Sequence, residues 1–271
     1  MVEFEPTGRS EVETPSTITL SPKVHNRVQR MLALTLRDSR ERAVDFYRFG
    51  EWWHRSAKTK GSPLRFNSKK REIQCSTAPN NSILRTLAML SLAFRTSGFD
   101  LVHEYEPDET IDAHTHPTLT SETLKKWWEA KIDMKGSGGI DEQIFNEFSD
   151  FINRNIGSTP SASDIMGDLR RVIYDQNEYS SLIIGATGMT VVVYRPHLGA
   201  ISTEKMNIVR RALNQYEKFR APDPHELVNW PRLIDNTRED ILLLLSQILK
   251  GRAEVYFTPD PANPILTRVS E

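Results

Sequence analysis

The chain has 271 residues, of which 38% are hydrophobic and 26% charged, and its formal net charge is −1. This composition is typical of a soluble globular protein with one large or two ordinary domains, and it excludes an intrinsically disordered chain. The most apolar expected helix, residues 241–249, is about half the ~20 residues that a membrane span needs, and the polar N-terminus lacks a signal peptide's apolar core. A single cysteine, Cys75, excludes an internal disulfide and favours an intracellular location, cytoplasmic or within a particle.

The N-terminal part is expected to begin with a flexible acidic tail, residues 1–20. A serine followed by a proline starts a helix over residues 21–37, because the hydroxyl caps the first turn and proline fits its first position. Apolar residues at helical spacing predict a second helix over residues 39–57. Residues 64–66 and 73–76 are predicted to pair as a short hairpin.

The middle of the chain alternates apolar and polar segments. Residues 83–94 are apolar on nearly all sides and predict a buried helix, followed by a strand over residues 99–105. Residues 106–117 are predicted to form an acidic, histidine-bearing loop, and residues 121–134 a helix. The glycine-rich segment 135–139 is the best candidate for a linker between domains.

The C-terminal part is predicted to contain helices over residues 140–156 and 161–174, a hairpin of residues 182–184 and 189–194, helices starting at Ser202 and Thr237, and a strand over residues 253–258. Helices dominate this pattern, and the expected strands are few and scattered. We therefore expect an α+β fold, predominantly helical, with a few short antiparallel strands or hairpins. The expected divisions are the tail 1–20, a basic domain 21–135 and a helical domain 136–271.

Positive charge is concentrated in residues 23–71, where fourteen Lys and Arg residues face four acidic residues, a net charge of +10. The flanking segments are acidic: −3 over residues 1–22, −4 over 72–136 and −4 over 137–271. Such a segment attracts polyanions, because each phosphate contact releases a condensed counterion. The candidate anion-binding residues are Arg27, Arg30, Arg37, Arg55, Lys58, Lys60, Arg65, Lys69, Lys70 and Arg71.

Aromatic side chains lie among these cations. Tyr47, Trp52, Trp53 and Phe66 are so placed that they could stack on unpaired bases, which favours single-stranded nucleic acid such as RNA. An anionic lipid surface is an alternative partner for the same charges.

Two histidines two residues apart form a second candidate site. On an extended segment His114 and His116 point to one side and could bind one metal ion, with Asp112 and Asp108 as oxygen ligands. The string from Ile111 to Pro117 resembles the His-x-His motif on the first strand of the amidohydrolase superfamily. The resemblance implies a (β/α)₈ barrel in which a bound metal activates water.

A third pattern overlaps the second. Pro107 and Asp108, followed by Glu129 and Lys131, have the residue types of a PD-(D/E)xK nuclease, which they resemble. In that family two carboxylates hold a divalent metal and the lysine steadies the attacking water.

The sequence leaves two functions open. The preferred interpretation is a non-enzymatic, cofactor-free protein that binds polyanions and assembles into a homo-oligomer. Viral matrix and nucleocapsid proteins have this role, an analogy based on charge and composition alone. The alternative is a metal-dependent hydrolase or nuclease centred on residues 104–131.

Overall fold

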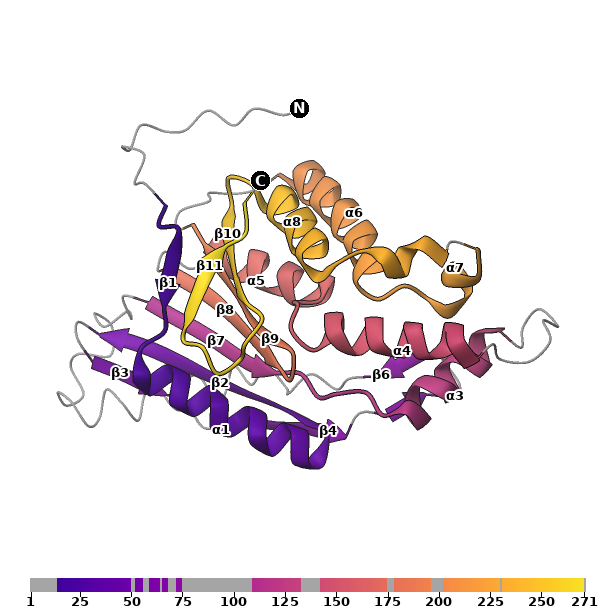
Figure 1. Ribbon diagram of the computed structural model, residues 1–271. Helices are drawn as coiled ribbons and strands as arrows, with labels where there is room; N and C mark the ends of the chain where they lie inside the picture. The colour runs from indigo at the N-terminus through magenta and orange to yellow at the C-terminus, as the bar shows by residue number, and fades with distance from the viewer. Residues whose placement is uncertain are drawn as a thin grey trace.

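A computed structural model describes residues 14–49, 52–55, 59–63, 65–67, 72–74, 109–132, 142–174, 178–195, 202–229 and 231–270. Across these ranges the dominant feature is a large mixed β-sheet with helices on both faces (Figure 1). The expectation of a predominantly helical α+β fold with a few short strands is therefore wrong.

Nine strands of the described chain form this sheet. Their order is β1 (Thr17–Thr19), β11 (Ile265–Arg268), β10 (Ala253–Thr258), β9 (Gly188–Tyr194), β8 (Glu178–Gly185), β7 (Glu109–Thr115), β2 (Arg40–Phe49) and β3 (Trp52–Arg55), with β4 (Thr59–Pro63) also paired to β2. Neighbouring strands are antiparallel except β7 and β8, which are parallel. A separate hairpin joins β5 (Arg65–Asn67) to β6 (Glu72–Gln74), which confirms the pairing predicted for this segment.

The helices of the described chain are α1 (Pro22–Asp38), α3 (Ser121–Ile132), α4 (Glu142–Ile156), α5 (Ala162–Tyr174), α6 (Thr203–Arg220), α7 (Pro224–Asn229), α8 (Arg238–Leu249) and the 3₁₀ helix η3 (Pro231–Asp235). The predicted starts are confirmed at three of them, where the side chains of Ser21, Ser202 and Thr237 cap α1, α6 and α8. No described helix combines the length and the apolar character required to cross a membrane.

Two expected elements are replaced by strands, and β1 lies within the tail that was expected to be flexible over residues 1–20. The helix expected over residues 39–57 is replaced by β2 and β3, because Val44 and Phe46 enter the core on one side of the sheet while Tyr47 is buried on the other. The loop expected over residues 106–117 contains β7, Glu109–Thr115. In residues 40–49 the apolar Ala43, Phe46 and Tyr47 also fit helical spacing, and in residues 109–115 the apolar residues are few. The apolar pattern therefore does not distinguish a strand whose second face is buried and polar.

Three layers result from this arrangement. Helix α1 covers one face of the sheet, where its Val24, Val28 and Met31 pack in one apolar cluster with Val44 and Phe46 of β2. Helices α3 to α8 cover the other face and form the larger apolar cluster with β9 and β10 (Figure 1). Successive residues of each strand alternate between these two environments.

Several expectations fall outside the described residues: the helix 83–94, the strand 99–105 and the linker 135–139. The domain division at residue 135 therefore stays a prediction. Strand β7 precedes residue 135 in the sequence and strand β8 follows it. The two strands are nevertheless hydrogen-bonded neighbours in one sheet.

Candidate metal centre

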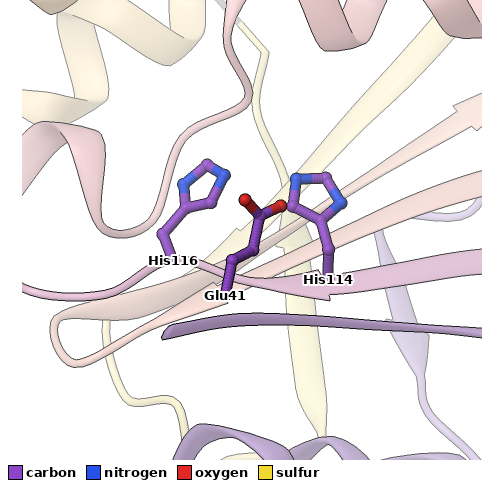
Figure 2. A group of neighbouring side chains, drawn as sticks. All are labelled: Glu41, His114 and His116. Atoms are coloured by element: carbon purple, nitrogen blue, oxygen red, sulfur yellow. The ribbon is translucent and has the colours of Figure 1, made fainter. Parts of the chain in front are cut away.

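The pairing of β2 with β7 brings a carboxylate beside the two histidines of the His-x-His string. Arg42 lies opposite Thr115 in this antiparallel pair, and both side chains contact Thr35 of α1. Because strand residues alternate in direction, Glu41 and His114 point to the opposite face, towards α5. Figure 2 shows the Glu41 carboxylate between the two imidazole rings.

These three side chains form a compact set of possible metal ligands. One ligand atom from each of Glu41, His114 and His116 lies within 4.8 Å of the other two. The imidazole ring centroids are 4.9 Å apart and the rings are tilted by 51°. Glu41 is 5% exposed and His116 8% exposed, so the set is largely shielded from solvent.

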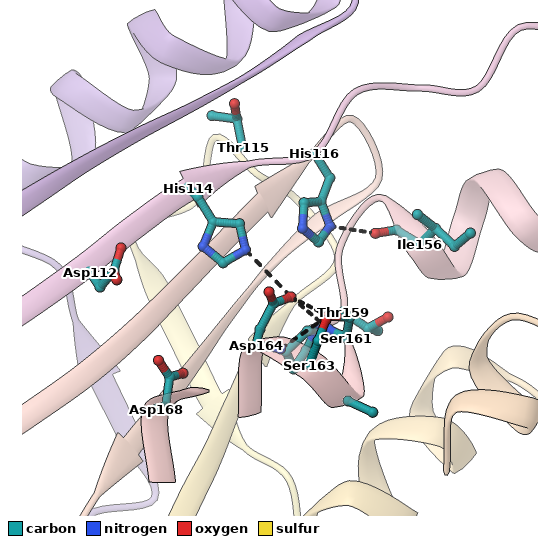
Figure 3. A network of polar contacts seen from close by, with 12 residues as sticks. Asp112, His114, Thr115, His116, Ile156, Thr159, Ser161, Ser163, Asp164 and Asp168 are labelled. Atoms are coloured by element: carbon teal, nitrogen blue, oxygen red, sulfur yellow. Dashed lines mark hydrogen bonds and ion pairs between the residues drawn. The ribbon is translucent and has the colours of Figure 1, made fainter. Parts of the chain in front are cut away.

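Hydrogen bonds orient the two imidazoles differently. His116 Nδ1 lies 2.7 Å from the carbonyl oxygen of Ile156, at the end of α4. A carbonyl oxygen accepts hydrogen bonds, so Nδ1 carries the proton and Nε2 keeps the lone pair that a metal ion requires. His114 Nε2 is buried without a hydrogen-bond partner in the described chain, and it lies 3.8 Å from Asp164 Oδ2 (Figure 3).

Asp164 belongs to the first turn of α5 and is held firmly in place. Its Oδ2 accepts hydrogen bonds from the backbone N–H of Ser161 at 2.9 Å and from the Ser161 hydroxyl at 2.7 Å. The side chain of Asp164 remains 17% exposed and that of His114 11% exposed. Both side chains therefore keep a small exposed fraction, although His114 Nε2 itself is buried.

The electrostatics of the two histidines are opposite. Burial, reinforced by the neighbouring His114, lowers the pKa of His116 to about 3, so this ring is neutral at physiological pH. Burial also acts to lower the pKa of His114, but the nearby carboxylates, Asp164 first and then Glu41, raise it overall. The His114 charge in turn lowers the pKa of Asp164 against the opposing effect of burial.

A second polar network lies beside the cluster on the same face of the sheet. Tyr179 and Tyr194 donate hydrogen bonds to the two oxygens of Asp168, at 2.9 and 3.1 Å. Arg171 donates to the Tyr179 hydroxyl at 2.8 Å and to Asp112 Oδ2 at 3.2 Å. Burial and the charge of Asp112 raise the pKa of Asp168 to about 7.

The ligand types restrict the chemistry of the cluster. Two imidazoles and one carboxylate are a set that zinc hydrolases and mononuclear non-haem iron enzymes use, and three protein ligands leave coordination positions for water or substrate. Metal–ligand bonds of about 2.0–2.1 Å place tetrahedral ligand atoms roughly 3.3 Å apart. In this structure the three ligand atoms lie within 4.8 Å of one another, so the two atoms that are furthest apart would need to approach by about 1.5 Å. Rotation of the side chains can supply a shift of this size.

The metal ligands predicted from the sequence are only partly assembled. His114 and His116 do lie together, whereas Asp112 pairs with Arg171 and Asp108 lies outside the described residues. Glu41 was missed because it precedes His114 by 73 residues in a segment expected to be helical. The strand pairing that joins them leaves no local signal in the sequence.

The two family resemblances gain no support from the fold. A (β/α)₈ barrel needs eight parallel strands, whereas one strand pair of the described sheet is parallel. Glu129 and Lys131 lie in α3 rather than on a strand, and Lys131 forms an ion pair with Asp223 at 2.6 Å.

The predicted anion-binding residues are described in part. Arg27, Arg30 and Arg37 lie on α1 and Arg55 on β3, while Lys60 on β4 forms an ion pair with Asp38 at 3.0 Å. Outside the described part lie Lys58, Lys69, Lys70, Arg71 and the side chain of Arg65.

The aromatic residues predicted to stack on bases are also described only in part. Tyr47 is 2% exposed, so its ring is not available to stack on a base. The side chains of Trp52, Trp53 and Phe66 lie outside the described part.

Comparisons with known proteins add no family to this picture. No protein-family model matches the chain, and no curated protein or solved structure shows a significant similarity to it.

Proposed function

We propose that Glu41, His114 and His116 bind one divalent transition-metal ion and that the protein is a metal-dependent hydrolase. The observation that carries this proposal is the convergence of the three ligand atoms within 4.8 Å from two neighbouring strands. The proposal departs from the expectation of a non-enzymatic, cofactor-free protein, and it develops the alternative that the His-x-His string indicated.

Within the described residues three possible ligands converge, and this number favours a catalytic site over a structural one. Structural zinc sites use four protein ligands, whereas catalytic sites use three and leave a position open. A bound Zn²⁺ or similar ion would supply Lewis acidity and lower the pKa of the water it holds. Imidazole and carboxylate ligands suit Zn²⁺ and Fe²⁺ in particular.

Residues that are not ligands have distinct roles in this proposal. Asp164 lies 3.8 Å from His114 Nε2, and its Oδ2 is fixed by Ser161, so it is placed to accept a proton from water at the site. The Ile156 carbonyl fixes the His116 ring and its tautomer, as backbone carbonyls behind the ligands do in known metal sites.

Metal binding can be tested directly on the full chain. After chelator treatment and dialysis, titration calorimetry with Zn²⁺, Mn²⁺ and Co²⁺ should show one site per chain. Glu41→Gln and His116→Gln should each weaken binding at least tenfold, while His25→Gln, on α1 away from the cluster, should leave it unchanged. Wild-type protein without a stoichiometric site, or variants that bind like wild type, would overturn the proposal.

Hydrolysis needs a separate measurement. The metal-loaded protein is assayed with chromogenic carboxylic and phosphoric esters, alongside Asp164→Asn. We expect metal-dependent turnover that falls at least 100-fold in this variant, while the metal stoichiometry stays at one. A metal-loaded wild type inactive on both ester classes would refute the hydrolase and leave a metal-binding protein.

The remaining predictions are compatible with this function. The predicted anion-binding residues on α1 lie on the opposite face of the sheet from the metal centre, so polyanion binding by these residues would not compete with it. Self-association into a homo-oligomer and an intracellular location stay predictions of the sequence.

A further inference from the structure

The outward side of α1 carries a row of cations. Lys23, Arg27, Arg30 and Arg37 follow one another at spacings of four, three and seven residues, which keeps them within one stripe of the helix. The opposite side of α1 is buried against the sheet through Val24 and other apolar residues. No acidic residue occurs in α1 before its last position.

Strand β3 adds a further cation to the same side of the molecule. Arg55 lies opposite Phe46 in the β2–β3 pair, and directly paired residues share a face of the sheet. Phe46 belongs to the apolar cluster under α1, so Arg55 also projects towards the α1 side, where it is exposed. Burial, together with the nearby charges of Arg55 and then Arg30, lowers the pKa of Arg27.

These arginines are not neutralised within the described chain. The ion pairs on this side engage other cations: Arg42 and Lys60 with Asp38, and Arg48 with Glu109. Within the described ranges none of Arg27, Arg30, Arg37 and Arg55 has an ion pair. We call these four residues the α1–β3 surface. No carboxylate of the described chain therefore compensates their positive charge.

We propose that the α1–β3 surface binds the phosphate backbone of nucleic acid. From Arg27 to Arg37 the row extends about 15 Å at 1.5 Å per residue, a length that covers several consecutive phosphates. Guanidinium groups match phosphate geometry through paired N–H donors. The buried ring of Tyr47 contributes no stacking, so the contacts we assign are to the backbone and do not select a sequence.

Nucleic acid fits this surface better than a lipid membrane does. A helix that inserts into a membrane interface presents its apolar face to the lipid, whereas the apolar face of α1 is buried against the sheet. Leu36, 45% exposed, is the one large apolar side chain of α1 that is exposed. Attraction to lipid would therefore rest on charge alone.

The α1–β3 surface and the metal centre lie on opposite faces of β2. Arg42 contacts α1, while the preceding residue, Glu41, points towards His114 and His116. A polymer bound at α1 would therefore leave the metal cluster uncovered. This inference does not depend on the hydrolase, and metal-free protein should bind nucleic acid equally well.

The test is fluorescence anisotropy with labelled oligothymidylate of about 20 nucleotides, and with a duplex of equal length, between about 50 and 200 mM salt. Four phosphate contacts predict a slope of log K against log salt of about −3 for the single strand and about −4 for the duplex. A slope near zero for both, or no binding at low salt, would overturn the proposal.

The variant Arg30→Gln/Arg37→Gln/Arg55→Gln should bind at least tenfold more weakly and with a slope near −1. The matched control is Arg170→Gln/Arg210→Gln/Arg211→Gln, which removes the same charge from exposed residues of α5 and α6. The control should bind within twofold of wild type.

Three outcomes oppose the assignment: equal losses in both triple variants, unchanged binding in the first, or binding to anionic phospholipid vesicles and not to either oligonucleotide. The last would assign the surface to a membrane. Circular dichroism and thermal melting of both variants confirm that they are folded.

Discussion

The hydroxyl oxygens of Thr35 and Thr115 lie 2.6 Å apart in the buried interface between α1 and β7. The Thr115 hydroxyl also accepts a hydrogen bond from the backbone N–H of Arg42 at 3.0 Å. Thr115 stands between the two histidines in the sequence and points to the opposite face. It therefore fixes the strand end from which His114 and His116 project.

Thr115→Val should weaken both the fold and the metal site. The valine keeps the shape but leaves the Thr35 hydroxyl and the Arg42 N–H without this partner, at a cost of about 1–3 kcal/mol in unfolding free energy. Metal affinity, measured by calorimetry, should fall severalfold because the strand end loosens. Thr19→Val, at an exposed position of β1, is the control and should change neither quantity. Lower stability with unaltered metal affinity would restrict Thr115 to a purely structural role.

Gly185 and Gly167 should respond in opposite ways to alanine. A Cβ at Gly185 would overlap the backbone carbonyl of Gly157, next to the Ile156 carbonyl that orients His116. We expect Gly185→Ala to cost about 3 kcal/mol or more and to weaken metal binding. Gly167 lies in α5, where an added Cβ would meet no atom within 4 Å, so Gly167→Ala should stabilise the fold by about 0.5–1 kcal/mol. Urea denaturation measures both, and equal effects would contradict the packing described for Gly185.

Asp168 should make stability depend on pH. Its folded pKa is about 7, above the roughly 3.9 of an unfolded aspartate, so the folded state binds more protons between these values. The contribution of Asp168 is therefore fully present below about pH 4 and is lost as the pH rises towards 7, by several kcal/mol.

Asp168→Asn should lack this decline. The check is the difference in unfolding free energy between wild type and variant at pH 4, 5, 6, 7 and 8 by chemical denaturation. Asp150→Asn, at an exposed position of α4, is the control and should run parallel to wild type. A parallel curve for Asp168→Asn as well would show that the Asp168 carboxyl titrates normally.

Asp38 should have the opposite pH dependence. Hydrogen bonds from Arg42, then from Lys60, lower the pKa of Asp38 well below its usual range. Its stabilising contribution is thus present above the unfolded pKa of about 4 and is lost as the pH falls below it. Asp38→Asn should cost about 2 kcal/mol at pH 7, because the buried Arg42 loses its charged partner, and the cost should shrink towards pH 2. Urea midpoints at both pH values provide the measurement; a constant difference would contradict the ion pair.

Local sequence was enough to predict several helices and the tightest turn. The starts of α1, α6 and α8 were predictable because a capping side chain and the 3.6-residue period lie within a few neighbouring residues. The β8–β9 hairpin was predictable because apolar strands flank a short turn with glycine at both ends. The His-x-His spacing likewise identified two of the three proposed metal ligands.

In contrast, residues 40–49 and 109–115 are strands because they pair with segments that are distant in the sequence. The same pairing brings Glu41 beside His114 and His116. Polar residues are buried on one face of these strands, so their apolar pattern is incomplete and fits a helix or a loop equally well. The third ligand depends on the hydrogen-bonded register of β2 against β7. This register brings together Glu41 and His114, which are 73 positions apart in the sequence. No periodicity along the chain encodes such a contact.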